Sequence, residues 1–161
     1  VHGGSVGEGG NIGEGYENWA KAIKEVEDIG VKVLVENTAG GKNSVARYMD
    51  SIERLWEVIG HLNVGLCLDT CHTWAGGIPT IDAVKGFKKL VKKIDLIHFN
   101  DSKDGFESSR DRHENLGKGK IPKEELEYVI KNAKTDIIVE TPNGPDAQKK
   151  DIAWIRRRLK K

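Results

Sequence analysis

The sequence predicts an α/β protein with a parallel sheet, organised as an incomplete (β/α) TIM barrel of about five of the usual eight units. Short runs of Val, Ile and Leu alternate with amphipathic segments of helical spacing, the pattern of parallel strands covered by helices. A complete barrel typically has about 250 residues, whereas the chain has 161. A five-stranded doubly wound sheet is the alternative, but no GxGxxG motif at a strand-to-helix turn supports its nucleotide-binding form.

Length and composition set the broad class. Residues 1–161 suffice for one ordinary core, so we expect a single domain. With 26 basic and 25 acidic residues the net charge is +1, so any surface for nucleic acid must be local. No apolar run approaches the roughly 18 residues that cross a bilayer and no signal peptide is present, so we expect a cytoplasmic protein without membrane partners. The chain opens at Val1 without an initiator Met, which suggests a fragment that lacks its amino-terminal βα units.

The elements follow in order from these patterns. Val1-His2 is read as the end of a broken first strand, and a Gly-rich loop follows from Gly3 to Gly15. Apolar runs predict strands over 31–35, 64–68, 96–99 and 136–139, the first of them buried on both faces. Helical spacing predicts helices over 14–29, 45–59, 80–91, 122–130 and 152–159, with Asn43 or Ser44 capping the second. Cys67 and Cys71 would lie about 13 Å apart in extended chain, too far for a disulfide, so we expect reduced thiols.

Acidic and imidazole side chains stand at the carboxyl end of each expected strand or just beyond it. They are His2, Glu36, Asp69, His72, His98 and Glu140. In a barrel these ends converge on one face. Asp111 and His113 follow the fourth strand, and their spacing turns both side chains to the same side in extended chain. Taken singly each has an ordinary structural explanation, but carboxylates gathered this closely repel unless a cation lies among them. Oxygen and nitrogen donors fit zinc, manganese or iron, and the histidines favour zinc.

Five separated motifs resemble, in the same order, those of the endonuclease IV family of apurinic/apyrimidinic (AP) endonucleases, AP endonuclease family 2. They are VENTAGG, GLCLDTCHTWAGG, IHFNDSKDG, RDRHENLGKGKI and VETP. The resemblance covers essentially the whole chain and implies the carboxyl-terminal part of an eight-stranded barrel with a trinuclear zinc centre. It implies a deoxyribonuclease IV-type hydrolase that cleaves double-stranded DNA 5′ to abasic sites in base excision repair.

The resemblance also assigns roles to residues by position. Glu36 would bridge two zinc ions, and its carboxylate would accept a proton from the attacking water. The second zinc would be completed by Asp69, His98 and Glu140, and the third would be held by His72, Asp111 and His113. His2 matches a histidine on the first zinc. Apart from the resemblance, several cations fall in connections after strands, hence on the same side as the metals, where they would meet DNA phosphates: Lys42, Lys103, Arg110, Arg112, Lys118 and Lys120.

The sequence departs from the family pattern in ways that bear on activity. A further histidine of the first zinc, and the side chains that the family inserts into DNA, belong to three βα units that this chain lacks. Lys42 and Pro122 replace glycines that are usual in the family, which affects only loop detail. Two other hypotheses therefore remain: a two-metal sugar isomerase or epimerase of the xylose-isomerase-like superfamily, and an inactive metal-binding fragment. Because three strands are missing, we also expect the isolated chain to be unstable, aggregated or oligomeric.

Overall fold

A computed structural model describes residues 1–160 and contains an open parallel sheet of four strands in the order β1-β2-β3-β6. The strands are β1 (Val33–Glu36), β2 (Val64–Asp69), β3 (Leu96–His98) and β6 (Asp136–Ile138). Each neighbouring pair is parallel, with Glu36 opposite Cys67 and Asp69 opposite His98. Within residues 1–160 the sheet does not close, so the chain has the architecture of an incomplete (β/α) barrel, as predicted.

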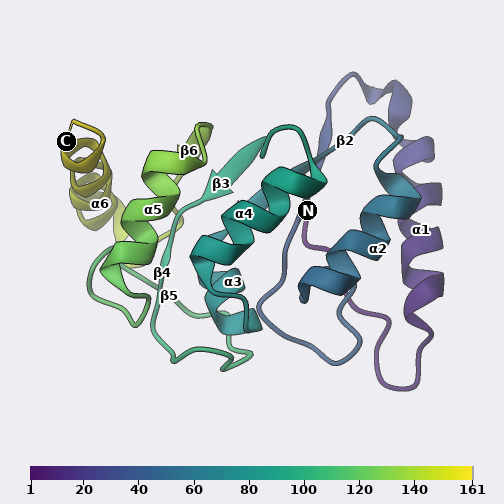
Figure 1. The fold of residues 1–161 in the computed structure, drawn as a ribbon, viewed down its shortest axis with the longest axis horizontal. Coiled ribbons are helices and arrows are strands. Elements are labelled where there is room, and N and C mark those ends of the chain that lie inside the picture. Colours follow the sequence, from purple (N-terminus) through teal and green to yellow (C-terminus); the bar gives the residue numbers. More distant parts are fainter. Residues whose placement is uncertain (161) are drawn as a thin grey trace.

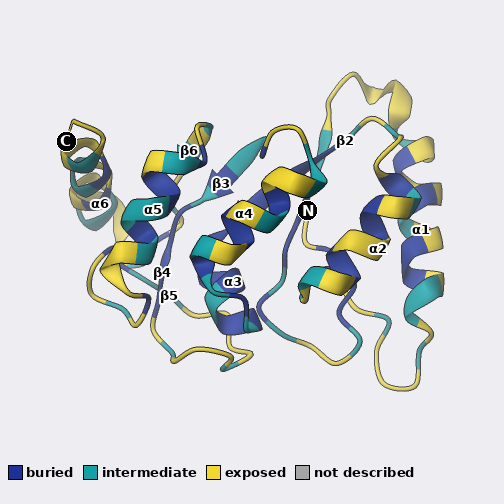
Figure 2. Ribbon diagram, in the orientation of Figure 1, coloured by how far each residue is buried: buried dark blue, intermediate teal, exposed yellow. Residues whose placement is uncertain are grey.

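The long helices lie side by side along one face of this sheet (Figure 1). They are α1 (Ile12–Glu25), α2 (Met49–Ile59), α4 (Thr80–Leu90), α5 (Lys123–Asn132) and α6 (Gly144–Leu159). Buried positions line the helix faces that point toward the strands, as the dark stripes of Figure 2 show. The core includes Ile52 and Leu55 of α2, Phe87 of α4 and Leu126 of α5, all of them buried. Helical spacing of apolar residues therefore predicted which faces pack on the sheet.

The amino-terminal residues add an irregular edge to the sheet beside β1. His2 forms a parallel bridge with Glu36, the Gly3 N–H donates to the Glu36 carbonyl oxygen at 3.0 Å, and the Glu36 N–H donates to the Val1 carbonyl oxygen at 2.9 Å. The predicted strand remnant is thus present as a short pairing. Its consequence is that His2 stands next to the acidic end of β1.

Three predictions about local structure are wrong. The predicted helix over 14–29 divides at Val26 into α1 and a short 3-10 helix, η1 (Glu27–Ile29), after which Gly30 takes a left-handed conformation. Neither Asn43 nor Ser44 caps α2, because the chain passes through a turn first and Tyr48 occupies the N-cap. The strand predicted over 31–35 begins only at Val33, and its first two residues are only partly buried, so burial on both faces is limited to Val35 and Glu36.

Two elements near the strand ends were not predicted. The short helix α3 (Thr70–Gly76) begins directly after β2, with the Asp69 side chain accepting from the His72 N–H at 2.8 Å. The strands β4 (Asp101–Ser102) and β5 (His113–Glu114) form a small antiparallel pair. Both elements bring candidate ligands toward the carboxyl ends of the main strands.

Two further expectations concern thiols and membranes. Cys67 and Cys71 are free and buried, as predicted. None of the helices within residues 1–160 combines the length and apolar content needed to span a bilayer.

Candidate metal centre

The structure brings the eight predicted donors together. Each belongs to at least one set of three or four residues whose potential ligand atoms all lie within 4.8 Å of one another. Glu36, Asp69 and His98 are the last residues of β1, β2 and β3, so parallel pairing brings them to the same edge of the sheet, with Asp69 opposite His98 and Glu36 opposite Cys67. Glu140 follows β6, His72 lies in α3, and His113 lies in β5.

The first set, the four-donor group, consists of Glu36, Asp69, His98 and Glu140. The His98 Nδ1 atom lies 3.0 Å from Glu36 Oε1 and 3.2 Å from Glu140 Oε2. Asp69 is fully buried at 0% exposure and Glu36 nearly so at 4%, whereas the Glu140 side chain reaches solvent. Three carboxylates and one imidazole thus converge from four neighbouring strands.

The second set, the three-donor group, consists of His72, Asp111 and His113. Asp111 Oδ1 lies 3.0 Å from His72 Nε2 and 3.2 Å from His113 Nε2. The two unpredicted elements make this group, because α3 carries His72, β5 carries His113, and Asp111 lies in the loop that joins β4 to β5. The prediction that Asp111 and His113 turn to one side agrees with their contact.

His2, Glu36 and His72 form a third set. Glu36 Oε2 lies 3.6 Å from His2 Nε2, and Glu36 Oε1 lies 3.4 Å from His72 Nδ1. The rings of His2 and His72 meet edge to face, with centroids 5.2 Å apart. Glu36 therefore belongs both to this set and to the four-donor group.

Two imidazole nitrogens in the three-donor group lack hydrogen bonds although they are buried. The Nε2 atoms of His72 and His113 both face Asp111, but neither makes a hydrogen bond of acceptable geometry within residues 1–160. On the far side of each ring, Nδ1 meets a carbonyl oxygen: that of Asn37 at 2.9 Å and that of Glu140 at 3.3 Å. A carbonyl only accepts, so each Nδ1 donates its proton to that carbonyl, and Nε2 is the nitrogen whose lone pair would be available to a cation once its own proton leaves.

Electrostatics keep the carboxylates of the centre ionised. Burial opposes ionisation of Glu36, but hydrogen bonds from His72 and His98 outweigh it and lower the pKa of Glu36 to about 2. The neighbouring imidazoles of His113 and His72 likewise lower the pKa of Asp111. Asp69 differs, because complete burial raises its pKa despite both imidazoles nearby.

The histidines respond in the opposite direction. Burial disfavours the charged form of His72, yet the charges of Asp69, Asp111 and Glu36 raise its pKa to about 11. The Cys67 sulfur and the Glu36 carboxylate raise the pKa of His98 to about 10. Without a metal ion, protons on these rings therefore balance the carboxylates. A divalent cation would supply the same positive charge.

Both cysteines lie next to the donors. The donor set chosen from the sequence did not include them. Cys67 forms a set with Glu36 and His98, and Cys71 forms one with Asp69 and His113. Burial and the charge of Asp69 raise the pKa of Cys71 to about 12, so its thiol stays neutral and is a poor ligand. Oxygen and nitrogen donors remain the better ligand set.

The predicted DNA-binding cations are exposed, and some already have acidic partners. Lys42 Nζ lies 2.6 Å from Glu8. Arg112 pairs with Asp104 through two nitrogens, and Arg110 lies 3.8 Å from the same carboxylate. Within residues 1–160, Lys103 and Lys118 form no salt bridge. Exposed pairs of this kind contribute little and leave the cations available to phosphate.

Two other sequence interpretations can be compared with the structure. Trp74, expected in a loop, lies in α3, where its ring packs against Phe106 with centroids 5.0 Å apart and its indole N–H donates to the Asp104 carbonyl oxygen. It therefore supports the loop that leads to Arg110. His61 is exposed, in agreement with its interpretation as an ordinary surface residue.

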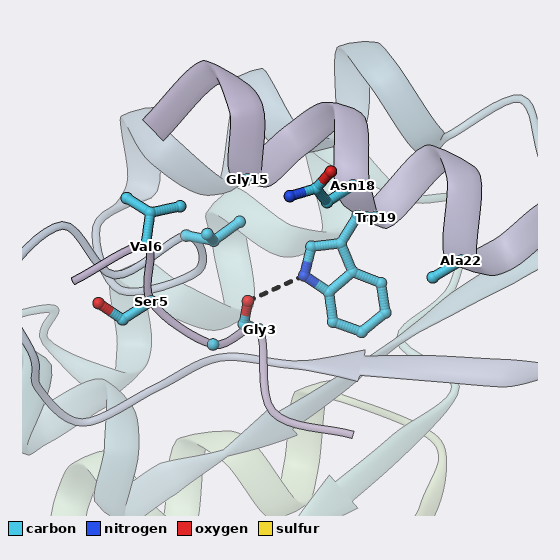
Figure 3. Close-up of a pocket in the computed structure, with 9 residues that line it drawn as sticks. Gly3, Ser5, Val6, Gly15, Asn18, Trp19 and Ala22 are labelled. Carbon is cyan, nitrogen blue, oxygen red and sulfur yellow. Dashed lines mark hydrogen bonds between the residues drawn. The ribbon is translucent and has the colours of Figure 1, made fainter. Parts of the chain in front are cut away.

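Two pockets lie near the amino-terminal segment. A recess of about 330 Å³ adjoins the centre, lined by His2, His72 and Asp111 and by small residues of the loops such as Gly40 and Ser109. A more apolar pocket of about 290 Å³ lies between residues 3–6 and α1, where the Trp19 N–H donates to the Gly3 carbonyl oxygen at 2.8 Å (Figure 3). None of the eight donors lines the second pocket.

The chain is similar in sequence to known proteins. Residues 1–158 match the family described as xylose isomerase-like TIM barrel. Probable endonuclease 4 of Mycobacterium ulcerans is 45% identical over 159 residues, and that of Mycobacterium tuberculosis is 47% identical over 158. These alignments cover 99% and 98% of this chain but only 62% of each relative.

Solved structures are similar as well. Endonuclease IV from Thermus thermophilus superposes with a TM-score of 0.77 at 30% identity, over 99% of this chain and 60% of that one. A D-tagatose 3-epimerase-like protein reaches a TM-score of 0.73 at 18% identity, over 99% of this chain and 61% of that one. The second likeness concerns the fold alone.

Proposed function

Because the chain belongs to the xylose isomerase-like TIM barrel family, we propose that its donor cluster is the metal centre of a zinc-dependent AP endonuclease. The proposed reaction is hydrolysis of the DNA phosphodiester 5′ to an abasic site during base excision repair. The chain spans 62% of the length of its mycobacterial relatives, whose names describe endonucleases. Their activity is therefore carried over as part of this proposal.

The three-donor group is the observation that carries the proposal. A barrel isomerase needs two divalent cations, which the groups that share Glu36 could hold. The additional set of His72, Asp111 and His113, with two buried nitrogens lacking partners, provides for another cation. A phosphodiester calls for such a centre, because its negative charge must be neutralised before a nucleophile can attack.

We assign the donors as follows. Glu36 would be shared between two ions, the rest of the four-donor group would hold one of them, and the three-donor group would hold another. His2 would contribute to the ion on the other side of Glu36, where it lies 3.6 Å from that carboxylate. Bound zinc would supply Lewis-acid activation of water and neutralisation of the phosphate. Manganese also fits these donors.

The chain's own residues would perform the remaining tasks. The carboxylate of Glu36 would accept the proton that the attacking water loses. The recess beside His2 and Asp111 is lined by small residues, several of which carry hydroxyl groups, and this suits a sugar-phosphate segment. Lys42, Lys103, Arg110, Arg112 and Lys118, all exposed, would contact duplex phosphates around it.

Nicking of a duplex that bears one abasic analogue tests the proposal. We expect zinc-dependent incision on the 5′ side of the analogue, loss of incision with a strong chelator, and recovery when zinc is restored. An undamaged duplex of the same sequence is the control. Isomerisation or epimerisation of a small sugar without nicking would support the sugar-isomerase alternative instead. Metal binding without either reaction would identify an inactive metal-binding fragment.

A further inference from the structure

Asn100 is a buried amide that connects two members of the four-donor group. It follows β3 and is 0% exposed. Its Nδ2 group donates to Asp69 Oδ2 at 2.7 Å, and its Oδ1 atom accepts from the Glu140 N–H at 2.9 Å. One side chain thus ties the end of β2 to the segment after β6, across the intervening strand β3.

The backbone of Asn100 is held relative to the same carboxylate. Its N–H donates to Thr70 Oγ1 at 2.8 Å, and the Thr70 hydroxyl donates back to the Asn100 carbonyl oxygen at 2.6 Å. Thr70 is the residue after Asp69 and is fully buried. These two hydrogen bonds fix the backbone of Asn100 beside Thr70, so its side-chain amide reaches Asp69 from a fixed position.

The two partners require an amide at this position. The Glu140 N–H can only donate, whereas an ionised Asp69 carboxylate can only accept, so the side chain between them needs an acceptor and a donor. An aspartate at position 100 would set one carboxylate against another. An apolar residue would remove the donor to the buried Asp69 carboxylate and the acceptor for the Glu140 N–H, so both groups would lose this partner.

These bonds determine how both partners face the centre. Asp69 accepts from the His72 N–H through Oδ1 and from Asn100 through Oδ2, so its carboxylate plane is fixed from two sides. The Glu140 backbone is fixed by Asn100, and from it the side chain reaches to 3.2 Å from His98. The Glu140 carbonyl also accepts from His113 Nδ1, which links the arrangement to the three-donor group.

We propose that Asn100 is a positioning residue that orients Asp69 and Glu140 toward a shared divalent cation. The inference rests on the proposed function only in requiring that the four-donor group binds metal. Removing a residue that orients metal ligands typically weakens metal binding on the order of 10- to 100-fold. We expect a loss of that size for Asn100→Ala.

Cobalt(II) titration of the full chain, followed by absorption spectroscopy, tests this without DNA. The matched control is Asn115→Ala. Asn115 is also a buried amide, and it donates to Asp151 at 2.7 Å and to the Pro142 carbonyl oxygen at 3.1 Å but hydrogen-bonds to none of the eight donors. Thermal unfolding of both variants separates lost stability from lost affinity.

Weaker cobalt binding by Asn100→Ala, with unchanged binding by an Asn115→Ala variant of similar stability, would support the proposal. Equal binding by the Asn100→Ala variant and the unmodified chain would overturn it, and so would parallel losses in both variants.

If the Asn100→Ala variant does not fold, NMR of the unmodified chain tests the proposal instead. Zinc should then shift the side-chain amide signals of Asn100 more than those of Asn115, and no shift on metal binding would overturn the proposal. Nicking is measured separately, so a chain that binds metal but does not nick would contradict the nuclease function alone.

Discussion

Glu36 is the donor that the four-donor group shares with the set of His2 and His72. It is almost fully buried, lies 3.0 Å from His98 and 3.4 Å from His72, and belongs both to the four-donor group and to the set with His2. The negative charge of its carboxylate is stabilised by neighbouring imidazoles rather than by Lys or Arg side chains. Such an arrangement favours a metal, because the same imidazoles become ligands once they lose their protons.

Glu36→Gln tests this residue directly. Glutamine keeps the size of the side chain but removes the charge, so we expect fewer bound zinc ions and at least about a 100-fold loss of nicking, the lower end for a lost proton acceptor. Metal content and nicking are measured on the same preparation. Glu53→Gln, an exposed change on α2, is the control and should leave both unchanged. Full activity of the Glu36→Gln variant would contradict its assigned role.

The titration of the cluster predicts how zinc stabilises the chain as the pH changes. The folded-state pKa of His72 is about 11 and that of His98 about 10, above the ordinary value of 6.5. The protonated imidazoles stabilise the metal-free fold fully below pH 6.5, and this stabilisation is lost as the pH rises through the folded-state pKa values. Glu36 has a folded-state pKa of about 2, below its ordinary pKa of 4.5. Its ionised form therefore stabilises the metal-free fold fully above pH 4.5, and this stabilisation is lost as the pH falls toward 2.

Zinc binding needs neutral imidazoles, so protons must leave when the metal binds. We therefore expect the zinc-induced rise in melting temperature to be larger at about pH 8 than at about pH 6, because both values lie below the folded-state pKa values of His72 and His98 and the protons leave more readily at the higher pH. Differential scanning calorimetry with and without zinc at both values measures it. A zinc effect that shrinks as the pH rises would mean that these histidines do not bind the metal.

At the scale of elements, a buried carboxylate holds the loop after β5 in place. Asp101 of β4 accepts from the backbone N–H groups of Gly117, Gly119 and Ile121 at 2.9, 3.0 and 3.1 Å. Gly119 has no room for a side chain, because a Cβ atom would collide with the Asp101 carboxylate. The loop carries Lys118, so its shape bears on the surface that we assign to DNA.

Asp101→Asn should loosen this loop. The new NH₂ group would face backbone N–H donors, and we expect a loss of about 2 kcal/mol in the free energy of unfolding. Hydrogen exchange of residues 117–121 should rise, as followed by mass spectrometry. Asp28→Asn, an exposed change in η1, serves as the control. Unchanged stability and exchange in the Asp101→Asn variant would show that the carboxylate does not hold the loop.

The elements also show how far sequence patterns reach. The strand ends at Glu36 and Asp69 were predictable, because strands of a parallel sheet are apolar runs that stop at polar residues, whereas β3 ends at His98, one residue before the predicted end at Phe99. The helix α3 was missed, since Thr70–Gly76 is short and contains two β-branched threonines. The β4–β5 pair was missed because strands of two residues each leave no periodic pattern.

The supporting amides were not predictable at all. Asn37 exchanges two hydrogen bonds with the backbone of Asp69 across 32 residues of sequence, and Asn100 reaches Glu140 across 40. Nothing local distinguishes such an asparagine from one in a turn. Only the strand register shows which residue stands opposite which.

For the whole molecule, the open sheet is the dominant feature. The strand β6 has one neighbour in the sheet, and its last residue, Ile138, is 48% exposed. Exposed apolar strand edges are templates for pairing with other chains. The comparison with the solved endonuclease IV agrees with an open sheet, because part of that protein's chain is not matched by this one.

We expect the isolated chain to self-associate through this edge. Sedimentation velocity should show an apparent molecular mass that increases with protein concentration. The Ile138→Lys variant should reduce this increase, because it places a charge on the edge strand. Ile29→Lys, a comparable change of an exposed residue in η1, is the control. A compact monomer at all concentrations would contradict this expectation.

Counting bound zinc by native mass spectrometry tests the central claim most directly. After zinc addition and dialysis, the chain should retain at least two ions, one for the four-donor group and one for the three-donor group. Glu140→Gln should remove the first and Asp111→Asn the second. A chain that retains no zinc, or variants that keep the full number, would contradict the account.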